Sequence, residues 1–262
     1  MKKHLKIISY YIRLNLASAL EYRASFITQA FCMALSNSSF ILFWGITFSQ
    51  IGGTIANYNF KDIVFIWAIT STGFGISNIL FTNASNITNL IVTGELDAFL
   101  LQPCNVIVNV LCAKTSLSAY GDFIYGIVLI CLFYGSDFRV WIWFIFGSLI
   151  CGCLLTAVTL TAHTLSFYLG DASSIGQFVA EFMMNFSIYP EKIYGPFIRV
   201  IMYSIIPAGI AVHLPLVMLH SFSFMKLLLA LVTIILYCVF AGKFFYCGLK
   251  RYESGNVIAT RL

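Results

Sequence analysis

Charged side chains are scarce in this chain, and their scarcity excludes most classes of protein. Asp, Glu, Lys and Arg make up 10% of its 262 residues, whereas a soluble domain has about 25%. A soluble fold needs polar side chains to cover its surface, yet 60% of these residues are hydrophobic. With a mean hydropathy of +0.91, we expect an all-α integral membrane protein that crosses the bilayer several times.

Motifs of nucleotide hydrolysis and of common hydrolases are also missing from the sequence. It contains no GxxxxGK[ST] phosphate loop, no HExxH and no GxSxG. Its eight cysteines include no CxxC pair, so we expect small apolar residues rather than metal ligands. Basic residues form no large polar face, which argues against nucleic acid as a partner. We therefore expect neither enzyme activity nor a metal or cofactor in the chain itself.

Long apolar runs predict the membrane-spanning helices. A bilayer core of about 30 Å needs about 20 apolar residues in a helix. Six runs come near this length, and the fifth of them is the weakest. They cover about residues 24–50, 63–82, 113–134, 140–167, 173–188 and 224–249.

The first 23 residues predict an amphipathic helix that lies in the inner membrane interface. Apolar residues recur there at helical spacing, with Lys2, Lys6 and Arg13 off their stripe. The stripe consists of Leu5, Ile8, Ile12, Leu16 and Leu20. A signal peptide is the alternative, because Ala17-Ser18-Ala19 resembles a cleavage site, but Arg13 and Asn15 interrupt its apolar region.

Prolines are few, and they cluster between the fifth and sixth runs. Residues 189–221 are largely apolar yet hold four of the five prolines: Pro190, Pro196, Pro207 and Pro215. Proline interrupts a helix, so each piece between them is too short to cross the bilayer. We expect a re-entrant hairpin of two short helices that enters from the extracellular side, with a single kinked seventh helix as the alternative.

Basic residues predict the orientation of the chain. With six spans, ten of the fifteen Lys and Arg residues share one side with both termini. The positive-inside rule makes that side the cytoplasm. A seventh crossing would place the C-terminal basic cluster, which includes Lys250, Arg251 and Arg261, outside. Both termini are therefore expected to be cytoplasmic, in a plasma-membrane protein.

Residues 90–103 form the main cytoplasmic loop in this topology. Gly94 and Pro103 bracket a short amphipathic helical turn. Its apolar anchors are Leu96, Phe99 and Leu100, and its acids are Glu95 and Asp97. A short helix with apolar anchors and a charged rim suits a groove on a partner protein. The alternative is a helix resting on the membrane surface, where the two acids would face anionic lipid.

Ionisable residues inside the predicted spans are Asp122, His163 and Glu181. Such residues are costly in a membrane and often mark a transport path. The alternative is that each is hydrogen-bonded within the helix bundle. In the fourth span, Ser148, Gly152 and Thr156 recur every four residues and allow close approach of another helix, either within the chain or in a dimer.

Four stretches in order resemble the ABC-2 type permeases, in particular the six-helix branch of bacterial drug and viologen export systems. Gly94-Glu95-Leu96-Asp97 with Leu100-Leu101 and Pro103 resembles the family's cytoplasmic loop. Glu21-Tyr22-Arg23-Ala24 resembles the junction of interface helix and first span. The extracellular re-entrant region and the C-terminal end are similar to Tyr189-Pro190, Ile193-Tyr194, Pro196, Arg199 and Ile206-Pro207, and to Leu249-Lys250-Arg251-Tyr252-Glu253-Ser254.

The resemblance implies a single ABC-2 transmembrane domain over residues 1–262. It also implies a permease that pairs with a second permease, of the same or a sister chain. Two cytoplasmic ABC ATPase subunits would bind ATP and Mg²⁺ and drive a hydrophobic or amphipathic substrate out of the cell. Residues 90–103 would be the helix that couples to them. A permease for a glycolipid or polysaccharide, an ion-coupled secondary transporter and a channel remain as alternatives.

Overall fold

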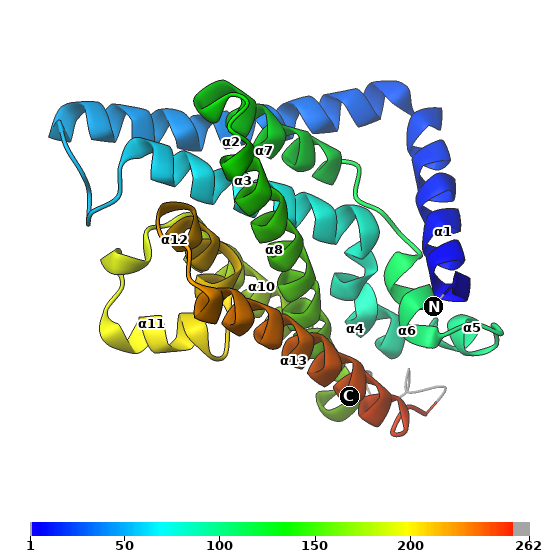
Figure 1. The fold of residues 1–262 in the computed structure, drawn as a ribbon. Coiled ribbons are helices and arrows are strands. Elements are labelled where there is room, and N and C mark those ends of the chain that lie inside the picture. Colours follow the sequence, from blue (N-terminus) through cyan, green and yellow to red (C-terminus); the bar gives the residue numbers. More distant parts are fainter. Residues whose placement is uncertain (1, 254–262) are drawn as a thin grey trace.

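The structure, a computed structural model, describes residues 2–253, with side chains from residue 8 onward except at residue 19. Within that range it is helical and contains no named strand, which confirms the all-α class. Its long helices cross one another obliquely, with α2 along one side and α13 along another (Figure 1). Ser254 and Arg261 lie outside the described residues.

In the described chain, four helices are long and apolar enough to cross a membrane. They are α2 (Arg23–Ile51), α3 (Phe60–Leu80), α8 (Phe138–Thr164), which α9 (Ser166–Leu169) prolongs, and α13 (Phe224–Leu249). The third and fifth predicted spans correspond to α7 (Ala119–Tyr134) and α10 (Ser173–Ile188), of 16 residues each. Sixteen residues reach about 24 Å, so the count of six crossings stays a prediction.

Helix α3 is the centre of the bundle and packs between α7 and α8. Small residues bring these helices close. A Cβ atom on Gly152 of α8 would lie 3.0 Å from the Gly73 carbonyl oxygen of α3, and Thr156 shares a 2.8 Å hydrogen bond with Ser77. The stripe that contains Gly152 and Thr156 therefore serves packing within the chain and is not a dimer face.

The third predicted span begins later than expected. Residues 113–118 are not helical and separate α6 (Val106–Cys112) from α7. The Thr115 hydroxyl donates to the Ile79 carbonyl at 2.9 Å, and the Ser116 amide donates to that of Asn78 at 3.0 Å. The last turn of a helix leaves carbonyls without a helical partner. This polar connection satisfies two of them at the end of α3, which explains why the helix does not run through Lys114.

Two short helices, rather than one kinked helix, connect α10 to α13. A 3₁₀ turn, η2 (Glu191–Ile193), leads into α11 (Pro196–Tyr203). A π-helical turn, η3 (Gly209–His213), then runs into α12 (Leu214–His220). Their helical lengths are about 12 Å for α11 and about 18 Å for residues 209–220, so neither crosses a bilayer core. Their entry into the bilayer stays a prediction.

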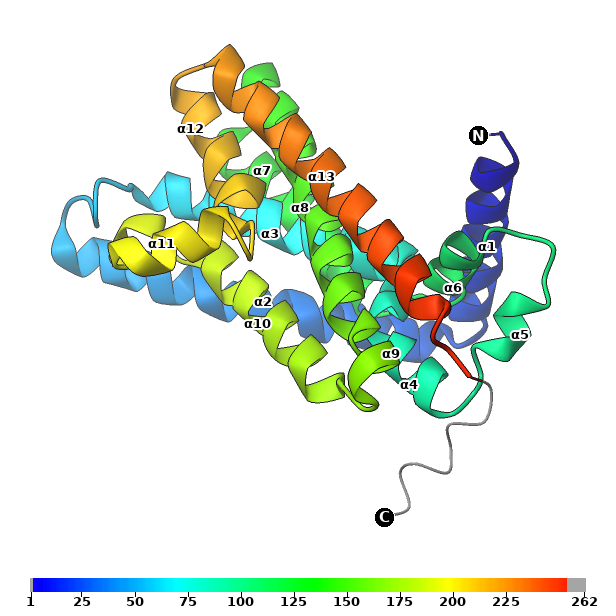
Figure 2. The same cartoon turned by 90° about the horizontal axis from the view of Figure 1, so that it is seen from below.

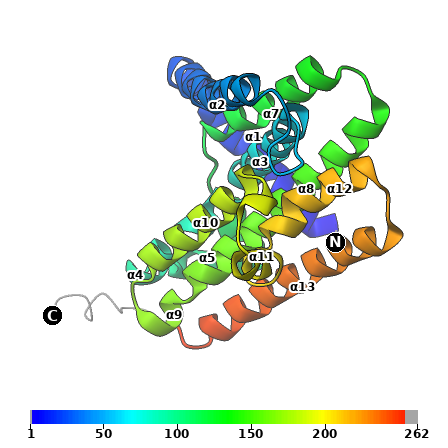
Figure 3. The ribbon, with the colours of Figure 1, turned by 90° about the vertical axis from the view of Figure 1, so that its left-hand side faces the viewer.

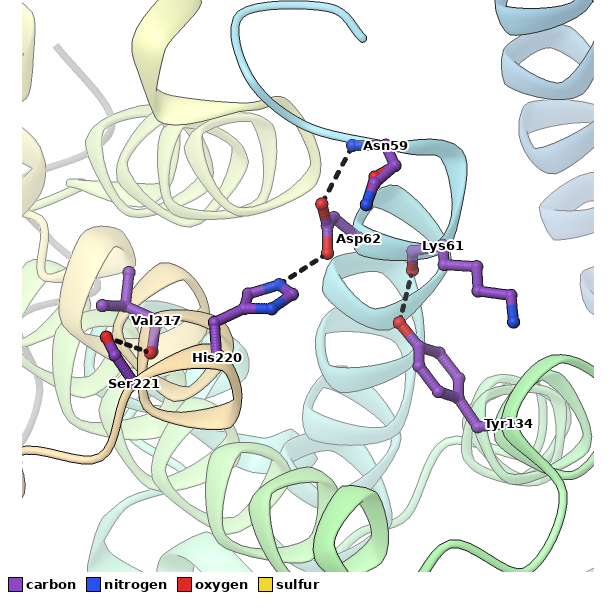
Figure 4. Close-up of polar contacts among 7 residues, drawn as sticks. All are labelled: Asn59, Lys61, Asp62, Tyr134, Val217, His220 and Ser221. Carbon is purple, nitrogen blue, oxygen red and sulfur yellow. Dashed lines mark hydrogen bonds and ion pairs between the residues drawn. The ribbon is translucent and has the colours of Figure 1, made fainter. Parts of the chain in front are cut away.

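A polar contact fastens this connection to the start of α3. Asn59 and Asp62 form a capping box at the N-terminus of α3. The Asp62 carboxylate also lies 2.8 Å from Nε2 of His220 at the end of α12 (Figure 4). On the other side of the helix, the Tyr134 hydroxyl donates to the Lys61 carbonyl at 2.9 Å. One turn of α3 therefore ties α12 and α7 together.

The N-terminal residues form the predicted separate helix, α1 (Lys2–Glu21), which turns away from α2 at Tyr22 (Figures 1 and 3). It packs against α6 rather than lying alone. The Tyr11 hydroxyl donates to Asn109, and the Asn15 amide donates to the Cys112 carbonyl at 3.2 Å. Leu16 and Leu20 of the predicted stripe are exposed. The side chains of Lys2, Leu5 and Lys6 lie outside the described part.

Candidate functional site

One end of the molecule gathers the N-terminal helix, the 82–112 segment and the C-terminal end of α13 (Figures 1 and 2). The segment comprises a 3₁₀ turn, η1 (Thr82–Asn86), followed by α4 (Ile87–Val92), α5 (Asp97–Leu100) and α6. Between α4 and α6 the chain projects from the bundle, with α5 at its tip (Figure 2). The sequence elements that were predicted to bind a partner therefore lie on the surface.

Gly94 and Leu96 set the path of this projection. Gly94 has φ +77°, a left-handed conformation that favours glycine after a helix end. The chain then turns back, and the Leu96 amide donates to the Leu90 carbonyl at 3.0 Å. The Leu96 side chain is 0% exposed, in an apolar cluster that includes Ile87, Val110 and Phe245.

The burial of Leu96 corrects its predicted role as an anchor for a partner. It holds the loop from the inside, and Phe99 is half-buried against the same cluster. Leu101, which sequence analysis did not single out as a contact, is 87% exposed. The signal was present, because Leu101 follows Leu100 and a helix of four residues cannot bury both. The exposed residues form what we call the outer face: Glu95, Ala98, Leu100, Leu101, Gln102 and Pro103.

Asp97 lies beside the end of α13. Burial, and then the Asp97 carboxylate next to it, raise the pKa of the Tyr252 hydroxyl to about 12. Tyr252 also packs edge-to-face on Phe167, with ring centroids 6.0 Å apart. The predicted loop motif and the predicted C-terminal motif are thus neighbours in space. Asp97 belongs to the support of the outer face, while Glu95 belongs to the face itself.

Amide side chains fix the base of the segment. Asn83 is buried and donates to the Val110 carbonyl at 2.7 Å, which joins η1 to α6. Asn109 donates to the side chain of Gln102 and accepts from Tyr11. Asn105 caps α6 by accepting from the Val108 amide at 3.3 Å. The segment is a braced projection whose two ends are hydrogen-bonded to each other and, through Asn109, to α1.

The structure does not bring the three predicted path residues together. Asp122 is buried between α2 and α7, where its carboxylate accepts from the Asn37 amide at 2.6 Å. His163 is buried at the far end of α8, where its Nδ1 lies 2.8 Å from the Thr88 hydroxyl of α4. These two residues make contacts between helices of the bundle.

Glu181 is placed differently. It is exposed in the middle of α10 and lines a cavity of about 260 Å³ between α3, α8 and α10. The cavity also holds amide and hydroxyl side chains on its walls: Ser77, Asn78, Thr82, Ser85, Thr159 and Asn185. An exposed carboxylate in the middle of an apolar helix is costly against lipid. This largely apolar cavity, with polar side chains among its lining residues, is the candidate path.

Several apolar helices in an all-helical bundle, with a projection at one end, define the class as a multi-pass membrane protein. A family model described as "ABC-2 family transporter protein" matches residues 34–256. The chain therefore belongs to the ABC-2 transporter family, as its four motifs indicated. It is a multi-pass membrane protein of a kind that associates with an ABC ATPase. No curated protein matches it significantly.

Proposed function

We propose that the chain is the permease subunit of an ATP-driven exporter and that the outer face of residues 93–103 receives the motion of a cytoplasmic ATPase subunit. The exposure of Leu101 carries this proposal. Leu101 and Leu100 are exposed on the projection, and Glu95 is exposed on the same face, as expected for an apolar contact with a charged rim. An ATPase subunit bound at this face would move α4 and α6, the helices on either side of the projection.

His163 and Gly176 connect α4 to α10, the helix that carries Glu181 and lines the candidate path. Thr88 on α4 contacts His163, and the His163 ring packs directly on Gly176 of α10. Movement of α4 would therefore be transmitted to α10 through the side chain of His163. Because Glu181 lies five residues beyond Gly176 on the same helix, we propose that the movement changes access to the cavity at Glu181.

The position of Glu181 also supports pairing with a second permease. The α10 face that contains Gln177, Phe178, Glu181, Phe182 and Asn185 is exposed in the single chain. Lipid is a poor neighbour for its carboxylate and amides. A second copy or a sister chain would cover this face and enclose a path with aromatic and acidic walls, which suits an amphipathic cation.

The test is co-purification followed by transport. The chain is produced with ABC ATPase subunits from the same genome, purified in detergent and reconstituted into vesicles. We expect a stable complex and vanadate-sensitive movement of an amphipathic cation. A complex that hydrolyses ATP but moves a glycolipid instead would favour the glycolipid alternative. Transport that follows an ion gradient without ATP would overturn the proposal.

A further inference from the structure

An apolar groove runs along α13 and shares no lining residue with the cavity at Glu181. Figure 2 shows α8 between α10 and α13. Residues of these three helices line the groove, together with Ile205 and Ile206 of the turn after α11. Its volume is about 700 Å³, within the range of about 300–1,000 Å³ that is typical of ligand sites. The lining includes Val158, Ala162, Val179, Ile206, Leu236 and Phe240.

The groove has few hydrogen-bonding groups available to a polar ligand. Two of its lining residues carry hydroxyls, and both hydroxyls are already used. Thr161 donates to the Ala157 carbonyl at 2.7 Å, and Tyr237 donates to the Ser204 carbonyl. Phe240 and Leu236 remain more than half exposed on the α13 side. A hydrocarbon chain fits such walls, and a membrane supplies it from the side.

A cation stands beyond one end of the groove. Phe244 lines the groove, Tyr168 stacks on Phe244 with centroids 5.5 Å apart, and the Arg251 guanidinium lies 4.8 Å from the Tyr168 ring centroid. The ion pair of the described chain joins Asp62 to His220. Within residues 2–253 the guanidinium therefore rests on an aromatic face and has its hydrogen-bond donors available for an anion.

The distances match one leaflet of a bilayer. From Leu236 to Phe244 the groove runs about 12 Å along α13, and the helix continues about 8 Å to its end at Leu249, two residues before Arg251. Half of a bilayer core is about 15 Å. α13 itself has 26 residues and spans about 39 Å, so its end reaches the headgroup level. An acyl chain in the groove would place its phosphate near Arg251.

We propose that this groove is a binding site for a single anionic phospholipid, with one acyl chain between α8, α10 and α13 and the phosphate on Arg251. The site differs from the general lipid surface because it combines an apolar groove of about 700 Å³ with a positioned guanidinium. It requires that the chain lies in a membrane, and it is independent of the direction and cargo of transport.

Native mass spectrometry of the detergent-purified chain tests the site. The probes are phosphatidylglycerol and phosphatidylcholine with identical acyl chains. We expect one phosphatidylglycerol to be retained per chain, in preference to phosphatidylcholine. Arg251→Gln should lower phosphatidylglycerol retention about tenfold, since a charged hydrogen bond contributes about 1.5–3 kcal/mol. Lys243→Gln is the matched control, because Lys243 is an exposed cation of the same helix outside the groove lining.

Thr161→Trp tests the slot, because an indole would fill it. Both lipids should then be lost together. If this variant does not elute as a single species, Phe240→Trp replaces it: its fluorescence should be quenched by phosphatidylglycerol with brominated acyl chains at a lower lipid fraction than by brominated phosphatidylcholine. Equal retention in wild type, Arg251→Gln and Thr161→Trp would overturn the proposal. So would a Thr161→Trp chain that keeps its lipid but loses a bound second copy, since the groove would then seat protein.

Discussion

Leu96 and Leu101 lie five residues apart in one loop, and the structure predicts opposite consequences for their replacement. Leu96 is 0% exposed, so Leu96→Ala removes a fully buried side chain from the cluster around Phe245. Such truncations cost roughly 2–5 kcal/mol of unfolding free energy. Leu101 is 87% exposed, so Leu101→Ser should change the stability of the free chain by less than about 0.5 kcal/mol.

For affinity toward the ATPase, we expect the replacement of Leu101 rather than that of Leu96 to remove a direct contact. Covering an exposed leucine contributes about 1.5–3 kcal/mol, which corresponds to roughly 10- to 150-fold in affinity. Leu101→Ser should weaken the complex by that factor while thermal unfolding in detergent stays unchanged. Affinity is measured by titrating labelled ATPase onto the purified chain, with Ala98→Ser as the control for a polar change on the same face. If Leu101→Ser binds the ATPase as wild type does, the outer face is not the docking surface.

Three further predictions concern the other contacts. Asp62→Ala should lower the unfolding free energy by about 1–2 kcal/mol because the capping box is lost, whereas His220→Ala, whose side chain is 59% exposed, should cost under about 1 kcal/mol; equal losses in thermal melts would contradict this. Gly176→Ala places a Cβ atom 2.3 Å from Nε2 of His163 and should destabilise the chain by about 1–3 kcal/mol, with partial recovery when combined with His163→Ala. Glu181→Gln should reduce vesicle transport of an amphipathic cation several-fold and leave ATPase affinity intact; unchanged transport would remove Glu181 from the path.

The helices were largely accessible to sequence reasoning because a bilayer imposes a length and an apolar composition on each span. α2, α3, α8 and α13 follow the predicted runs closely. The start of α7 was misplaced because the predicted span was extended back through Ala113 and Leu117, although residues 113–118 also hold Lys114, Thr115, Ser116 and Ser118. Their polar groups instead complete the hydrogen bonds at the end of α3. That requirement belongs to a different segment and is invisible in the local sequence.

The role of the loop residues was harder to predict for a related reason. Helical spacing places Leu96, Phe99 and Leu100 on one face, but α5 is only four residues long. Its orientation is set by the left-handed Gly94 and by the Leu96–Leu90 hydrogen bond. Periodicity identifies that a face is apolar. Whether the face meets the chain's own core or a partner depends on the turn that precedes it.

The roles of polar residues inside the bundle are also hard to predict from residue type, and the structure distinguishes them. Asn37–Asp122, Ser77–Thr156 and Thr88–His163 each join two different helices. Interhelical hydrogen bonds of this kind contribute about 0.6 kcal/mol on average in membranes. Such pairs hold helices in register, and residue type alone does not separate them from a transport site. Glu181 differs because, within the described chain, it is exposed and lines a cavity instead of bonding to another helix. A carboxylate in that position is stable only if it contacts water, a substrate cation or a second permease. Because the energetic cost of a carboxylate in the membrane makes such residues rare, the position of Glu181 points to one of these contacts.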